Sequence, residues 1–281
     1  MRSFALLGLV VGLLVVSAVA SPWVTWWVSA LFHKPFTLSR VYNRVFEVLL
    51  VVGLLLAWRR LELGGARDIG LARHDWAPQL SRGLAIGLIG VGIGLTVCWL
   101  CGGLVPDLRY AGLKTVRKVL LGVGAAVLIG VGEEALFRGV LLRRLMRDFG
   151  RIAGIATTTA IYAVVHIIGH VRRRGQVTPW SGVEHTLALF APVARPEEVP
   201  ALLGLTLLGL LLVAARLRTG SLWTAIGIHA AWVAAFRVGR LLFHIRPDPT
   251  WLVGSGWPPL IGGATGAIAL GVTAILLMRR R

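Results

Sequence analysis

Long apolar runs separated by short polar stretches dominate the pattern of hydrophobic and polar positions in this chain. Eight runs predict helices: residues 4–20, 41–58, 83–105, 119–137, 152–170, 201–215, 219–236 and 258–278. None alternates apolar and polar positions as a half-buried strand does. A helix of about 20 apolar residues crosses a hydrocarbon layer about 30 Å thick. The pattern therefore predicts an all-α, polytopic membrane helix bundle of about eight transmembrane helices, folded as one transmembrane domain over residues 1–281.

Two polar connections have distinctive patterns. The longest, residues 171–200, carries Arg172–Arg174, Glu197–Glu198 and several prolines. It is a candidate lid or substrate-entry loop, with an ordinary solvated loop as the alternative. Residues 141–151 combine arginines and leucines in the pattern of an amphipathic helix. Such helices are typical of the membrane surface.

The first apolar run has two interpretations. Arg2, an apolar core and Ala18-Val19-Ala20 before Ser21 resemble a cleavable secretory signal. The core is long for a signal, however, and the tryptophans within residues 23–27 resemble an aromatic belt at a membrane interface. We expect a retained first helix. With eight spans, the connections on the same side of the membrane as the N-terminus carry slightly more Lys and Arg than those on the opposite side. This favours a cytoplasmic N-terminus.

Composition supports a membrane protein. Of the 281 residues, 56% are hydrophobic and 15% charged, whereas soluble domains carry about 25% charged residues. The net charge of +18 would suggest nucleic acid in a soluble protein. Here the arginines flank apolar runs, as helix ends that face anionic lipid require. We therefore expect membrane lipids and no nucleic acid as partners, and the oligomeric state stays open.

Two adjacent carboxylates stand far inside the fourth run. If a helix starts near Val119, Glu133 lies about 21 Å along it at about 1.5 Å per residue. Ionisable groups at such depth indicate function. Glu134 and Arg138 are four residues apart, in the order that favours an ion pair on one helix face, whereas Glu133 points about 100° away. The alternative is a solvated charge cluster at a helix end.

Two histidines lie in later apolar runs. His166 and His229 could each be a hydrogen-bonded interhelical residue. Together with Glu133 they could instead hold a hydrolytic water, with the glutamate as base and imidazole accepting a proton or stabilising an oxyanion. His166 and His170 also have the four-residue spacing of paired metal ligands. No glutamate follows the first histidine, so the zincin pattern is not met.

Other hydrolytic sites are not indicated. The chain lacks the G-x-S-x-G motif of a nucleophilic serine. All aspartates lie outside the apolar runs, so a paired-aspartate membrane protease is unsupported.

The ordered motifs resemble the CAAX prenyl protease and bacteriocin-processing (CPBP, Abi) family of intramembrane proteases. The family pattern is Glu-Glu-x-x-x-Arg, then an aromatic residue four positions before His, then a further His with Asn or Asp four positions later. This chain supplies Glu133, Glu134 and Arg138, then Tyr162 and His166, then His229. The resemblance covers a family-like catalytic core of about residues 115–240.

The resemblance implies a role for each motif residue. Glu133 and His166 would activate water, Glu134 and Arg138 would hold the architecture, and His229 would stabilise the tetrahedral oxyanion. The family is often described as glutamate-type without a catalytic metal, and accordingly we expect no cofactor. The alternative cofactor is one divalent metal such as zinc, held by Glu133, His166 and His229.

One position departs from the family pattern. Four residues after His229, where the family has Asn or Asp, this chain has Val233. Losing one oxyanion donor typically costs about 2.7–4 kcal/mol in kcat. Candidate replacements are Asn43, Trp232, Arg237 and a backbone N–H group. Arg237 is a candidate supporting residue because it is four positions beyond Val233 and has five N–H donors.

These observations together predict an intramembrane endopeptidase that hydrolyses a membrane-associated or lipidated peptide. We expect a multi-pass protein of a bacterial or archaeal cell membrane. A non-catalytic scaffold or immunity-type relative of the same fold remains an alternative, supported by Val233. A proton- or cation-coupled transporter is a further alternative, although transporters usually show internal repeats.

Overall fold

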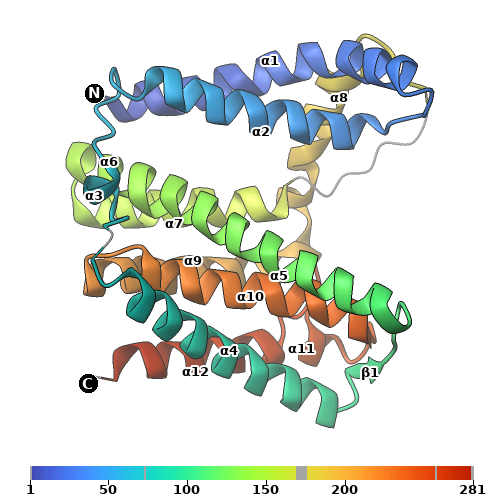
Figure 1. Ribbon diagram of the computed structural model, residues 1–281, viewed down its shortest axis with the longest axis vertical. Helices are drawn as coiled ribbons and strands as arrows, with labels where there is room; N and C mark the ends of the chain where they lie inside the picture. The colour runs from blue at the N-terminus through green and yellow to red at the C-terminus, as the bar shows by residue number, and fades with distance from the viewer. Residues whose placement is uncertain (1, 73, 169–175, 257, 280–281) are drawn as a thin grey trace. The chain divides into compact units, whose positions relative to one another are not determined.

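The computed structural model describes residues 2–72, 74–168, 176–256 and 258–279. Nearly all of this chain is helical, with two short strands (Figure 1). Each of the eight predicted apolar runs overlaps a helix, although the third ends in a strand and the first six residues of the last precede its helix. The prediction of an all-α, polytopic helix bundle is confirmed.

Contacts divide the chain into two compact units. The first comprises Met1–Gly64 and Ile167–Arg195, and the second comprises Gly65–His166 and Pro196–Arg281. The apolar pattern gives no sign of this division, because the first unit is assembled from two segments more than 100 residues apart.

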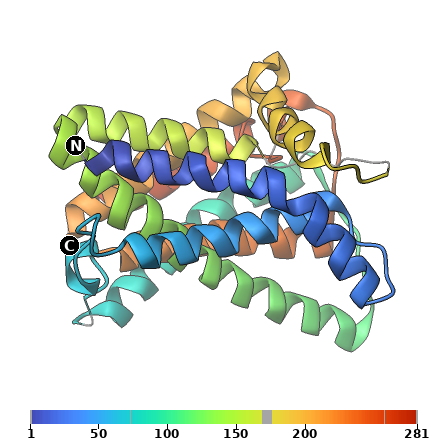
Figure 2. The same cartoon turned by 90° about the horizontal axis from the view of Figure 1, so that it is seen from above.

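The first unit is built on a pair of antiparallel helices. α1 (Arg2–Leu31) and α2 (Leu38–Ala57) lie side by side in both views (Figure 1, Figure 2). Its other elements are α8 (Ser181–Phe190) and the 3₁₀ turn η2 (Ala191–Ala194). α8 lies within the predicted polar connection 171–200, which thus contains a helix.

Close backbone contact explains how α8 joins this pair. A Cβ atom on Gly182 would lie 1.8 Å from the carbonyl oxygen of Ala18, so only glycine permits the approach. The Thr186 hydroxyl donates to the Tyr42 hydroxyl at 2.9 Å. Such contacts between small residues are the usual way for helices to pack in lipid.

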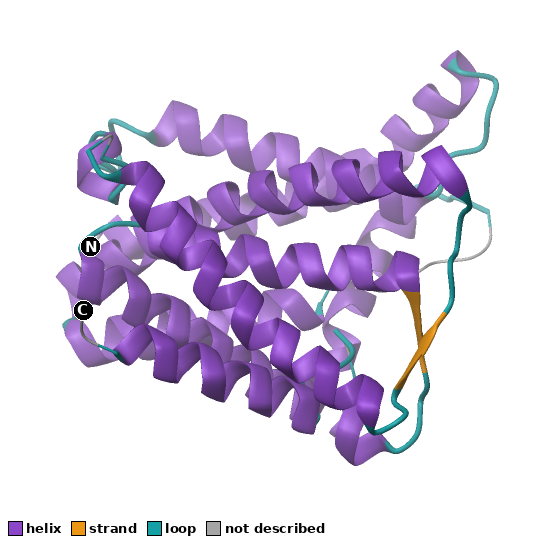
Figure 3. Cartoon of the chain, turned by 60° about the horizontal axis from the view of Figure 1, so that its bottom comes forward, coloured by secondary structure: helices purple, strands orange, loops and turns teal. Residues whose placement is uncertain are grey.

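The second unit contains the remaining elements. Its helices are α3 (Ala66–Ile69), α4 (Trp76–Leu100), α5 (Gly112–Glu134), α6 (Leu142–Phe149), α7 (Arg151–Ile167), α9 (Val199–Thr219), α10 (Trp223–Leu242), α11 (Thr250–Val253) and α12 (Ala264–Met278). The π-helical segment η1 (Ala135–Leu141) joins α5 to α6, and the 3₁₀ turn η3 (Pro196–Glu198) precedes α9. The strands β1 (Leu104–Pro106) and β2 (Phe243–Ile245) pair antiparallel, with Leu104 opposite Ile245 (Figure 3). The last residue of α7 is counted with the first unit.

α10 is the central helix of the second unit. Residues 224–231 are all buried, and glycines allow the neighbouring backbones to approach. A Cβ atom on Gly227 would lie 2.5 Å from the carbonyl oxygen of Leu80 on α4. On the other side, a Cβ atom on Gly130 of α5 would lie 3.2 Å from the carbonyl oxygen of Ile226. The polar residue carried by this stretch, His229, is thereby held next to the end of α5.

The described residues include five helical segments that are long and apolar enough to cross a membrane. They are Arg2–Leu31, Trp76–Leu100, Gly112–Phe149, Pro196–Thr219 and Trp223–Leu242. α7 and α12 are shorter apolar helices. The segment Gly112–Phe149 is continuous through η1, so α6, which lies within the predicted amphipathic stretch 141–151, extends the helix that carries the two glutamates. The chain is a multi-pass integral membrane protein.

Candidate active site

The paired glutamates stand where the hydrogen-bonding pattern of the helix changes. Glu134 is the last residue of α5, and the next seven residues form the π-helical segment that contains Arg138. π-Helical turns are rare and are often found at functional sites. Glu134 and Arg138, four positions apart, are in contact across this junction: the Arg138 Nη1 atom donates to Glu134 Oε1 at 2.7 Å.

Glu134 lies in a closed ionic cluster. Its side chain and that of Arg138 are both 0% exposed. Glu134 Oε1 also accepts a hydrogen bond from His229 Nδ1 at 2.8 Å. Arg138 Nη2 donates to the carbonyl oxygen of Gly209 on α9 at 3.2 Å. Each buried charge thus has a partner of opposite sign, whereas Glu134 Oε2 and Arg138 Nε make no hydrogen bond to a described residue.

Glu133 has different surroundings. Its side chain is 33% exposed, and its Oε2 atom lies 3.2 Å from His166 Nε2 and 3.8 Å from His229 Nε2. One ligand atom from each of these three residues lies within 4.8 Å of the other two. Even so, Glu133 Oε2 accepts no hydrogen bond from any residue that the structure describes.

The partner of Nδ1 indicates which ring nitrogen of each histidine carries a hydrogen. His166 Nδ1 lies 2.8 Å from the carbonyl oxygen of Tyr162, and His229 Nδ1 faces the Glu134 carboxylate. A carbonyl or carboxylate oxygen can only accept, so Nδ1 carries a hydrogen in both rings. In a neutral ring the lone pair then lies on Nε2, which faces Glu133 in both cases, whereas a second proton would make Nε2 a donor. Glu133 Oε2 and the two Nε2 atoms thus face a common small volume.

Tyr162 holds the histidines from one side. It is fully buried, and its ring lies 4.2 Å from the His166 ring and 6.1 Å from the His229 ring between centroids. The Arg138 guanidinium lies 4.2 Å from the centre of the same ring. Tyr162, predicted as the aromatic residue of the second motif, thus contacts the ionic cluster and both histidines.

The candidate replacements for the missing oxyanion donor lie in different places. Trp232 is half-buried, and its Nε1 atom is buried without a hydrogen-bond partner among the described residues. Arg237 is exposed and packs its Cβ atom toward Gly122, which is about 16 Å from Glu133 along α5. The structure therefore does not bring Arg237 to the cluster. Asn43 lies on α2, in the other unit. His170, the alternative metal ligand, lies outside the described residues.

Gly209 is a member of the site that sequence reasoning missed. A Cβ atom there would lie 3.1 Å from Thr159 Cγ2, 3.1 Å from Tyr162 Cδ1 and 3.6 Å from Arg138 Nη2. A larger residue would therefore crowd Thr159 and Tyr162, next to the arginine whose hydrogen bond the Gly209 carbonyl accepts. The only signal in the sequence is a glycine inside a run of leucines, which is common in membrane helices.

Comparison with protein families identifies the segment that holds this cluster. Residues 115–235 match the family described as Rce1-like, type II CAAX prenyl endopeptidase Rce1-like. The chain carries an Rce1-like domain. This confirms the family that the motifs indicated. Comparisons with curated proteins and with solved structures give no match.

The Rce1-like domain begins in α5 and ends in α10, so it contains all six motif residues from Glu133 to His229. The family is one of peptidases, which supports the prediction of a membrane-embedded endopeptidase. It also supports a lipid environment and a peptide substrate.

Proposed function

We propose that the Rce1-like domain hydrolyses peptide bonds with a water molecule activated by Glu133 and His166. The observation that carries this proposal is the 3.2 Å approach of Glu133 Oε2 to His166 Nε2, in a ring whose Nδ1 atom faces the carbonyl oxygen of Tyr162. A water molecule beside them could donate one hydrogen to each. Such a water is held by two acceptors, which raises the electron density on its oxygen.

In this mechanism Glu133 is the general base. As the water oxygen attacks the carbonyl carbon of the peptide bond, Glu133 takes one proton and the carbonyl oxygen becomes an oxyanion. The protonated glutamate then gives the proton to the departing amine, and the carbonyl forms again. General bases of this kind typically contribute about 10²–10⁴-fold to the rate.

His229 is placed to stabilise the oxyanion, but only as an imidazolium. Because Nδ1 donates to Glu134, a second hydrogen on Nε2 is needed before this ring can donate to substrate. The charges support that state: the carboxylates of Glu133 and Glu134 are balanced by Arg138 and a protonated His229. A buried cluster with no net charge costs less than one with an unpaired charge.

A divalent metal is a second candidate because the same three residues fit one. Catalytic zinc is commonly held by three protein ligands from His and carboxylate side chains. Here Glu133, His166 and His229 offer such a set, and both Nδ1 atoms are held by an acceptor as in known zinc sites. Zinc in this place would supply a Lewis acid and a water of lowered pKa.

The family name makes a lipidated C-terminal peptide the first substrate to test. We propose purified protein in proteoliposomes, a farnesylated peptide ending in a CAAX sequence, and the same peptide without the lipid. In water enriched in ¹⁸O, the new carboxylate of the product should carry one ¹⁸O atom. Glu133→Gln should abolish the product, whereas Glu197→Gln, the same change at an exposed site, should not.

The outcomes separate the candidates. Cleavage of both peptides would support an endopeptidase without a prenyl requirement. Product without ¹⁸O would contradict direct attack by water. If the wild-type protein cleaves neither these peptides nor a membrane-peptide library, the non-catalytic scaffold becomes the better interpretation.

A further inference from the structure

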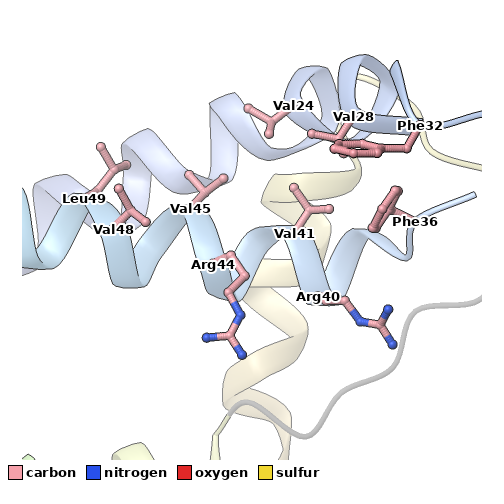
Figure 4. Close-up of a pocket in the computed structure, with 10 residues that line it drawn as sticks. All are labelled: Val24, Val28, Phe32, Phe36, Arg40, Val41, Arg44, Val45, Val48 and Leu49. Carbon is pink, nitrogen blue, oxygen red and sulfur yellow. The ribbon is translucent and has the colours of Figure 1, made fainter. Parts of the chain in front are cut away.

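An apolar groove runs between α1 and α2 in the first unit, apart from the motif residues (Figure 4). Its volume is about 420 Å³, and its apolar walls include Val24, Val28, Val41, Val45 and Leu49. Ligand sites in proteins typically have volumes of roughly 300–1,000 Å³. The groove is therefore large enough for a ligand, and its walls favour a hydrocarbon.

The groove is elongated. Val24 and Val28 line it from one face of α1, and Phe32, in the turn just after α1, follows at the same four-residue spacing with its N–H bonded to the Val28 carbonyl oxygen. These three residues span about 12 Å along the helix. A narrow strip of this length suits an extended chain better than a compact ligand.

Two arginines lie along the edge of this strip. Arg40 and Arg44 are four positions apart on α2, and both are exposed. Arg44 pairs with Glu47, whereas no acidic side chain among the described residues pairs with Arg40. The side chains of Arg40, Arg44 and Glu47 together carry a net charge of +1. Two guanidinium groups one turn apart are well suited to a phosphate, which accepts several hydrogen bonds at once.

The beginning of α2 also favours an anion. Arg40 lies in its first turn, where the helix dipole is positive and a basic residue is unfavourable on its own. Thr37, at the N-cap, makes no side-chain hydrogen bond to the first N–H groups. α2 itself therefore offers nothing to offset this positive charge, and a bound anion would.

Aromatic residues indicate the depth of this end of the groove. Trp23, Trp26 and Trp27 are exposed on α1 beside the groove residues Val24 and Val28. Exposed tryptophans gather at the interface between lipid and water. Phe32 and Phe36 meet edge to face, with ring centroids 6.1 Å apart, at the turn between the helices. These aromatic residues favour the headgroup level for this end of the groove, with Val45 and Leu49 extending from there toward the hydrocarbon.

We propose that this groove binds one anionic glycerophospholipid. One acyl chain lies along the valines, and the phosphate lies between Arg40 and Arg44. The site is selective for negative headgroups, because the positive choline of a zwitterionic lipid would lie near the same arginines. This proposal does not depend on catalysis in the second unit.

Competitive lipid binding tests the headgroup. Purified full-length protein in detergent is incubated with equal amounts of phosphatidylglycerol and phosphatidylcholine that carry the same acyl chains, and retained lipids are counted by native mass spectrometry. Wild type should retain one phosphatidylglycerol with at least about fivefold preference, since each basic side chain near such a headgroup contributes a factor of this order. The Arg40→Gln/Arg44→Gln variant should lose the preference. Arg59→Gln/Arg60→Gln, which removes the same charge just beyond the other end of α2, should keep it.

A second pair of variants tests the acyl chain. Val28→Trp fills the groove without changing charge and should lower retention. Val52→Trp, at an exposed position of α2 outside the groove, should have no effect. Equal retention of both lipids by wild type, or equal loss in the Arg59/Arg60 control, would overturn the proposal. So would displacement of the lipid by an equal concentration of glycerol phosphate or of a free fatty acid.

Discussion

Glu133 and Glu134 are neighbours in the sequence but lie in opposite kinds of surroundings. Glu134 is fully buried and is bonded to Arg138 and His229. Glu133 is one-third exposed, and its Oε2 atom faces two histidine nitrogens without accepting a hydrogen bond from a described residue. The comparison indicates a division of labour, in which a fully buried carboxylate paired with Arg138 and His229 stabilises the fold and a partly exposed carboxylate is accessible for reaction.

His229 belongs to both surroundings. Its Nδ1 atom is bonded to Glu134, and its Nε2 atom points toward Glu133. The stabilising cluster therefore also fixes the orientation of a ring that faces the reactive carboxylate. Variants of the two glutamates should consequently fail in different ways.

The largest expected effect is that of Glu133→Gln. Removing the general base should lower kcat by about 10²–10⁴-fold, with the yield of folded protein near that of wild type. Peptide cleavage in proteoliposomes measures the first quantity, and size-exclusion chromatography with a thermal unfolding scan measures the second. Activity like that of wild type would end the glutamate mechanism.

Glu134→Gln should act mainly on stability. It leaves Arg138 as a buried cation without its carboxylate, and breaking a buried ion pair typically costs about 3–5 kcal/mol. We expect a clear loss of folded protein in the membrane and a lower unfolding temperature. Arg138→Met should show the same defect, because it leaves Glu134 as the unpaired charge. Normal stability in both variants would remove the distinction between the two glutamates.

A smaller effect is expected at Trp232, whose buried Nε1 atom has no described partner. If this N–H replaces the donor missing at Val233, Trp232→Phe should reduce kcat by roughly tenfold or more with little change in KM. Val233→Asn should raise kcat and partly restore the activity of Trp232→Phe. Arg237→Ala, at an exposed position outside the cluster, should change kcat much less. Equal kcat for Trp232→Phe and wild type would exclude the indole as a donor.

The smallest expected effect is that of metal removal. If Glu133 and His166 activate water by themselves, exhaustive chelation should leave the rate of peptide cleavage unchanged. The purified protein should then hold no stoichiometric zinc by elemental analysis. One zinc per chain, with activity lost on its removal and restored on its return, would establish the metal alternative.

The sequence alone was sufficient to predict most of the long helices and to identify the motif residues. An apolar run of about 20 residues predicts a helix that crosses the hydrocarbon layer, and all eight predicted runs overlap helices of the structure; among the described residues, five helical segments are long and apolar enough to cross. The ion pair of Glu134 with Arg138 was also predictable, because residues four positions apart meet on one helix face. The order of the motifs was enough to indicate the family that the comparison then confirmed.

Only the tertiary structure decided which atoms face one another. His229 is 95 positions from Glu134 in the sequence, and their contact depends on the close packing of α5 against α10 at Gly130. The hydrogen on each Nδ1 follows from a partner that no pattern names, a backbone carbonyl for His166 and a carboxylate for His229. α8 was not predicted, because it is only ten residues long and lies in the stretch 171–200 that was predicted to be a polar connection. Local patterns encode burial and helix faces, whereas distant contacts and protonation depend on how closely the backbones pack.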